Sequence, residues 1–267
     1  MPTTRIVRFA LASGLGVSAV VLAFQPDPTM LRHVYEEALA KRRAEYGVGD
    51  PHTAQAARDL GLFLQRSGNT IAARRALSET IALDEVALGR SAPQTLEDAA
   101  SLAAVSSPSE AERLYRRAAE SADAAVAGPA LSSLAGLRKA AGDRAGAAAY
   151  LRRALEKAEL VDGKDGTIVA LILNSLALDV EAQQGIALLE RALQIDRARL
   201  GEHDPNTILT EVNLSRLLLA AGRASDAADV ARQALSNSEA AFGPGDARTL
   251  KAARDLAAII KAAPARK

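Results

Sequence analysis

Small residues recur along this chain at nearly fixed distances, and this spacing restricts the possible folds more than any other feature. One set, here called first anchors, directly follows a leucine and comprises Gly61, Ala103, Ala135, Ala177, Ser215 and Ala257. The second anchors lie between them and comprise Ala38, Thr80, Ala118, Ala154, Ala192 and Ala234. Five of the six steps from a second to a first anchor are 23 residues long, and the return steps are 19 or 15. This register predicts an array of internal repeats.

Each repeat carries local signals for two helices. Asp50-Pro51 and Asp204-Pro205 place a capping acid before a proline, whose missing N–H costs nothing at the first helical position. Glycines that can end a helix stand nine residues after five of the second anchors, at Gly47, Gly89, Gly163, Gly201 and Gly243. Aromatic residues make up only 3% of the chain, so the core must be aliphatic and rich in alanine, the best helix former. We therefore predict an all-α chain of five full two-helix units with a half unit at each end.

Two of the units are four residues shorter than the others. In the second unit Ser107-Pro108-Ser109-Glu110 replaces the glycine turn, and we expect a capping box there, with Ser107 and Glu110 bonding each other's backbone N–H groups. The fourth unit, about residues 164–201, has no comparable turn signal, so its internal boundary stays open.

With these residues in hand, the chain resembles the tetratricopeptide repeat, in the longer 42-residue variety found in kinesin light chains. The segments that carry the resemblance include GEHDPNT from Gly201, VNLSRLLLAAGRASDAA from Val212 and LLERALQIDRARLG from Leu188. The resemblance covers roughly residues 29–262. It implies a right-handed superhelical solenoid of antiparallel helix pairs, whose first helices line a concave groove that holds a protein or peptide partner.

The family resemblance also implies which side chains face that groove, namely the two before each leucine-anchor pair and the one after it. Carried over to this chain, these are Arg58, Asp59, Ser132, Ser133, Asn174, Ser175, Asn213, Arg216, Arg254 and Asp255. Polar groups there can hydrogen-bond the backbone of a bound peptide. The family's paired asparagine is kept only in part, as Asn174 and Asn213. A solvated helix face is the alternative interpretation for each residue.

The first 25 residues have a different character. Arg5 and Arg8 precede an uncharged run from Phe9 to Phe24, the pattern of a secretory signal peptide, and we expect cleavage after Ala23. The alternatives are an uncleaved membrane anchor, although the run is shorter than the ~20 residues of a spanning helix, and a buried N-terminal helix. We expect export to the periplasm or cell exterior, or repeats held outside the cytoplasm by an inner-membrane anchor. Residues 26–28 are then a linker, and 263–267 a disordered tail.

Composition and motifs argue against most other functions. The net charge is +1, which gives no reason to expect nucleic acid or a lipid surface beyond the N-terminal segment. The chain has no cysteine and three histidines, with no cluster of metal ligands and no nucleophile motif, so we expect no cofactor, metal or catalysis. The predicted function is an exported, non-catalytic scaffold for protein or peptide partners. A membrane-anchored assembly subunit and a solenoid accessory to an enzyme on another chain are the alternatives.

Overall fold

The computed structural model describes residues 27–262, and all regular secondary structure in that range is helical. The helices are α1 (Pro28–Tyr46), α2 (Pro51–Arg66), α3 (Thr70–Ala87), α4 (Pro93–Ala103), α5 (Pro108–Ala119), α6 (Ala124–Ala140), α7 (Arg144–Asp162), α8 (Thr167–Ala177), α9 (Ala182–Arg199), α10 (Pro205–Ala220), α11 (Ala224–Phe242) and α12 (Ala247–Ala262). Helices α2 to α11 form five pairs, while α1 and α12 are the half units. The predicted all-α solenoid with this unit count is confirmed.

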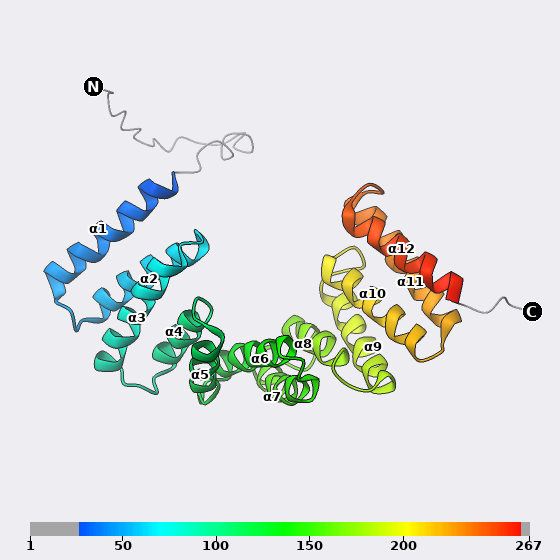
Figure 1. Ribbon diagram of the computed structural model, residues 1–267, viewed down its shortest axis with the longest axis horizontal. Helices are drawn as coiled ribbons and strands as arrows, with labels where there is room; N and C mark the ends of the chain where they lie inside the picture. The colour runs from blue at the N-terminus through cyan, green and yellow to red at the C-terminus, as the bar shows by residue number, and fades with distance from the viewer. Residues whose placement is uncertain (1–26, 263–267) are drawn as a thin grey trace, which may run out of the picture.

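The helices pack in chain order, each against the one before it and the one after it. Figure 1 shows the pairs following an arc from α1 to α12. The first helix of each unit (α2, α4, α6, α8 and α10) lies on the inner side of this arc, and the second helix on the outer side. A ligand bound inside the arc would therefore contact mainly first helices.

Local chemistry at the joints between units explains this regularity. The carboxylates of Asp50 and Asp204 accept hydrogen bonds of 2.8 Å from the backbone N–H groups of His52 and Asn206, so each acid caps its helix. Three residues into the same helices, the hydroxyls of Thr53 and Thr207 donate to the carbonyls of the preceding turn glycines at 2.7 Å. All five of those turn glycines have φ between +73° and +93°, a conformation that favours glycine.

The two shorter units close in different ways. Ser107 is the N-cap residue of α5, but its side chain makes no capping hydrogen bond, so the expected capping box is absent. Pro108 has no N–H to satisfy, and the Ser107 carbonyl accepts the first intrahelical bond from Ala111 at 2.8 Å. In the fourth unit, α8 ends at Ala177 and α9 begins at Ala182, which places the boundary that the sequence left open.

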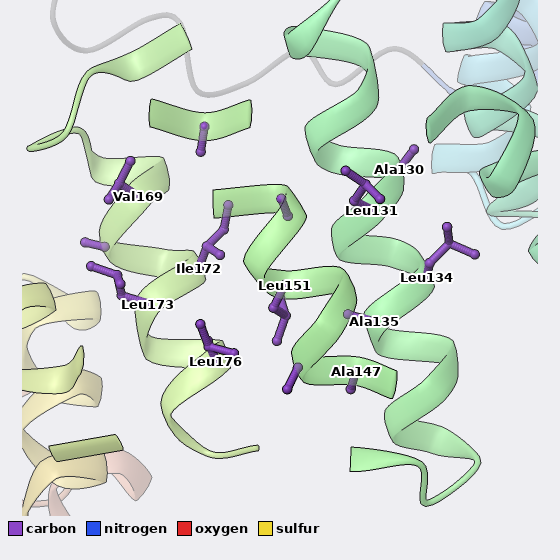
Figure 2. Packing of buried hydrophobic residues seen from close by; sticks show 14 of the residues in the cluster. Ala130, Leu131, Leu134, Ala135, Ala147, Leu151, Val169, Ile172, Leu173 and Leu176 are labelled. Atoms are coloured by element: carbon purple, nitrogen blue, oxygen red, sulfur yellow. The ribbon is translucent and has the colours of Figure 1, made fainter. Parts of the chain in front are cut away.

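The anchors lie where the helices of a unit approach each other most closely. All second anchors from Thr80 to Ala234 are fully buried, and the first anchors from Gly61 to Ser215 are buried too. Leucines and isoleucines fill the space around them, and Figure 2 shows Leu131, Leu151 and Leu173 packing between α6, α7 and α8. Stability therefore comes from stacking of neighbouring helices, as in other repeat arrays.

The N-terminal predictions fall mostly outside the described residues. The leader 1–25 and the tail 263–267 lie beyond them. Helix α1 begins at Pro28, because the carboxylate of Asp27 accepts the Thr29 N–H at 2.9 Å and caps the helix. Within residues 27–262, none of the helices combines the length and apolar character needed to cross a bilayer.

Candidate functional site

Arg58, the first of the predicted groove residues, is engaged by other parts of the protein. Its guanidinium donates from Nε and Nη2 to both carboxylate oxygens of Asp98 in α4, at 2.7 and 2.9 Å. Nη2 also donates to Asp84 in α3. All three side chains are nearly inaccessible to solvent, so Arg58 joins α2, α3 and α4 from within.

This cluster holds two carboxylates and one guanidinium. Burial disfavours the charged form of Asp84, and a hydrogen bond with Asp98 adds to this effect, so that the pKa of Asp84 is raised to about 6. Two buried acids that share one cation therefore tend to keep a proton between them. The cluster is suited to joining helices across a unit boundary rather than to binding a ligand.

The same three repeat positions form a different cluster between the fourth and fifth units. Asn174, Asp196 and Thr210 correspond in register to Arg58, Asp84 and Asp98. Asn174 Nδ2 donates to Thr210 Oγ1 at 2.6 Å, and Thr210 Oγ1 donates to Asp196 Oδ2 at 2.8 Å. Burial likewise raises the pKa of Asp196.

Asn213 extends this second cluster, because its Nδ2 donates to Asn174 Oδ1 at 2.8 Å. The partial asparagine pattern in the sequence thus corresponds to a hydrogen-bonded pair across two units. Both side chains are buried, although Asn174 also lines a cavity that opens to the inner side of the arc.

The other predicted groove residues lie at or near the surface. The three serines bond carbonyls of their own helices: Ser132 with Gly128, Ser133 with Pro129 and Ser175 with Leu171. Asp59 accepts from Gln55, and Arg216 donates to Asp255 of α12 at 2.6 Å. Arg254 is exposed. Ligand contact by any of these residues stays a prediction.

Apolar side chains that the sequence analysis did not single out line the inner side of the C-terminal units. A cavity of about 220 Å³ lies between α8 and α10. Its walls include Leu171 and Leu209, which are 57% and 47% exposed, together with Ile168 and Leu200. Asn174, Asp196 and Thr210 are the polar residues lining it.

A second cavity, also about 220 Å³, lies between α10 and α12. Leu209 lines both cavities, so they form one continuous surface, here called the C-terminal groove. Val212 and Phe242 make the second cavity largely apolar, and Arg248 and Lys251 of α12 add positive charge to its wall. The C-terminal groove can therefore accept apolar side chains next to an acidic group.

The repeat register shows that this apolar character is local. The position six residues before each first anchor holds, in chain order, Gln55, Glu97, Pro129, Leu171, Leu209 and Lys251. Large aliphatic residues occupy it only in the fourth and fifth units. Aligning the units on their anchors would have exposed this signal in the sequence, because a leucine at an otherwise polar helix position is unusual.

No arrangement suited to catalysis is evident in the described part of the chain. Residues 27–262 contain no group of three or more histidine, aspartate or glutamate side chains placed to hold a metal ion. The groups with raised acid pKa values, Asp84, Asp196 and Glu211, are each bonded to neighbouring side chains. Their geometry is that of buried contacts between helices.

Comparison with known proteins supports the repeat assignment. The tetratricopeptide repeat family pattern matches residues 181–240, which span α9, α10 and most of α11. No curated protein sequence matches this chain.

Among solved structures, BtubC (BKLC) from P. vanneervenii is similar over 91% of this chain and 96% of its own, with 20% identity and a TM-score of 0.64. A Podosopora anserina chain of nearly identical TPR-like repeats, assigned to the kinesin light chains, is 15% identical over 80% of this chain and 89% of its own, with a TM-score of 0.40. The assembly chaperone of RpL4 (Acl4) is 14% identical over 88% and 97%, with a TM-score of 0.47. At these identities the likeness concerns the fold alone.

Proposed function

We propose that this protein is an exported, non-catalytic scaffold that binds a protein or peptide partner in the C-terminal groove. The observation that carries the proposal is the pair of cavities that meet at Leu209 on the inner side of the arc. Exposed leucines at this surface are unfavourable in water, and contiguous exposed apolar surface commonly marks a binding site.

The chemistry of the groove limits the class of partner. Leu171 and Leu209 fit apolar side chains of a peptide, which would gain about 25 cal/mol for each Å² of apolar surface that they bury. Asn174 lies between these leucines, where its amide can bond a peptide backbone. Lys251 and Arg248 at the α12 end favour an acidic residue or a C-terminal carboxylate. An extended segment with apolar and acidic residues is therefore the preferred partner.

Affinity capture from cell-envelope extract, with the wild type and two variants, tests groove binding. Leu209→Asp places a charge where the two cavities meet, and we expect it to lose the partners that the wild type captures. Leu160→Asp is the matched control, since Leu160 is highly exposed on α7, an outer helix. The proposal is wrong if all three proteins recover the same partners equally while showing equal thermal stability.

Export is tested separately, through the N-terminus of the protein found in envelope fractions. Cleavage after Ala23 gives a chain that starts at Phe24. A mass that retains Arg5 would instead support the alternative of a membrane-anchored assembly subunit.

A further inference from the structure

The terminal helices expose repeat positions that every full unit buries. Each full unit buries its two anchors, but Ala38 in α1 and Ala257 in α12 are exposed. The reason is the position of these helices, since α1 is a second helix whose unit has no first helix within residues 27–262. In the same range α12 is a first helix without its second. The contact that normally covers an anchor is therefore missing at both ends.

On α12 the exposed positions form one stripe, here called the α12 end face, made of Leu250, Ala253, Ala257 and Ile260. The first three positions are buried in every full unit. Position 260 corresponds to Leu64 and Leu218, which are buried, whereas Ile260 is 53% and Leu250 is 50% exposed. Spacings of three and four residues place all four side chains on one side of the helix.

On α1 the corresponding stripe, the α1 end face, comprises Leu31, Val34 and Ala38. These positions face the first helix of the same unit wherever that helix is present. In α3 they are Ala73, Ala76 and Thr80, all buried, whereas Val34 is 55% exposed. Helix α1 still packs on α2 through Leu39 and through Tyr35, which stacks on Phe63 at 4.9 Å.

We propose that the partner of these surfaces is a second copy of this chain, so that α12 of one copy and α1 of the next form a complete repeat unit. The α12 end face is shaped to pack against a second helix, and the α1 end face against a first helix. A pairing of the two would continue the helix–helix interface that closes each full unit. In the first unit that interface sets Gly61 against Leu77, and the equivalent contact would set Ala257 against Tyr35 of the next copy.

The symmetry of this contact determines what it builds. Two different faces meet, so the contact is heterologous and each added copy leaves one free face of each kind. The product is an open head-to-tail chain whose superhelix continues from copy to copy. The groove residues Lys251 and Asp255 lie at other positions of α12, so this proposal does not depend on groove binding.

Light scattering on the full-length protein, purified as the cell processes it, can test the proposal with variants that block one face each. Ala257→Arg blocks the α12 end face, and Ala38→Arg blocks the α1 end face. Ala258→Arg and Ala40→Arg are the controls, because both residues are exposed and their repeat positions are also largely exposed in the full units. Thermal unfolding establishes that each variant is folded.

We expect the mass of the wild type and of both controls to grow with concentration between about 1 µM and 1 mM, the range of weak complexes. Ala257→Arg and Ala38→Arg should each stay monomeric, while their equimolar mixture should double in mass, because each supplies the face that the other retains. A wild type that stays monomeric overturns the proposal, and this includes the case in which a retained segment 9–24 covers α1. A dimer formed by either blocked variant alone also overturns it, since that would require two identical faces to pair.

Discussion

Gly185 in α9 lies so close to Ala177 in α8 that a Cβ atom at position 185 would stand 2.5 Å from the Ala177 carbonyl oxygen. Ala177 is the first anchor of the fourth unit, which lacks a glycine turn and is four residues shorter than its neighbours. The short connection brings the start of α9 directly against the end of α8. Glycine is therefore required here by the closeness of two backbones, since its conformation is ordinarily helical.

We predict that Gly185→Ala destabilises the protein by about 1–3 kcal/mol, because a backbone carbonyl cannot move aside as a flexible side chain can. Gly136→Ala in α6 is the matched control. A Cβ at position 136 would meet no atom within 4 Å, so this variant should gain roughly 0.5–1 kcal/mol from helix propensity alone. Urea unfolding of both variants measures the difference, and two effects of the same sign would contradict this account.

The anchors explain why so much of the fold could be predicted from the sequence. Helix ends depend on neighbouring residues, such as Asp50 before Pro51, and a repeated pattern confirms each signal several times over. Ser107 shows the limit of this reasoning. Its sequence fits a capping box, but whether a side chain or the backbone satisfies a helix start depends on a rotamer that the motif does not determine.

The anchors also predict how the array responds to overpacking. Ala154 and Ala192 are fully buried between the helices of their units. We expect Ala154→Leu or Ala192→Leu to lower the melting temperature by several degrees, since three added carbon atoms would force the helices apart. Ala149→Leu on the exposed side of α7 should leave it nearly unchanged. Unaltered melting in both anchor variants would refute the proposed register.

The candidate site was harder to predict than the fold. The family resemblance placed Arg58 at the groove, but its neighbours Asp84 and Asp98 are 26 and 40 residues away in the sequence. An ion cluster across three helices has no local motif. The same holds for Leu209, whose exposure depends on the curvature of the array as well as on its helix position. Only alignment of the units shows that acids recur four residues after two second anchors, as Asp84 and Asp196.

The Asp84 cluster predicts a specific dependence of stability on pH. Asp84 keeps its proton to about pH 6 in the folded protein, but only to its ordinary value of 3.8 when unfolded. Between these values the folded state binds more protons, so the contribution of Asp84 is present below pH 3.8 and is lost as the pH rises through 6. The slope for one proton approaches ~1.4 kcal/mol per pH unit.

Asp84→Asn removes this proton and serves as the reference. On lowering the pH from 7 to 5, we expect the free energy of unfolding of the wild type to rise by about 1 kcal/mol relative to Asp84→Asn. Denaturant titrations at the two pH values measure this difference. Asp59→Asn, which changes a more accessible acid next to Arg58, should track the wild type. An identical pH response in Asp84→Asn would show that Asp84 is already ionised at pH 5.

The two equivalent clusters allow one to be exchanged for the other. Arg58→Asn alone leaves the buried carboxylates of Asp84 and Asp98 without their cation, and breaking a buried pair in this way typically costs about 3–5 kcal/mol. Adding Asp98→Thr recreates the arrangement of Asn174, Asp196 and Thr210, in which the hydroxyl links the amide to the remaining acid. We therefore expect the double variant to be more stable than Arg58→Asn, in a double-mutant cycle measured by urea unfolding. Additive losses would mean that the matching register does not bring with it matching geometry. Because Arg58→Asn acts through stability, a loss of partner binding in this variant would not by itself identify Arg58 as a groove contact.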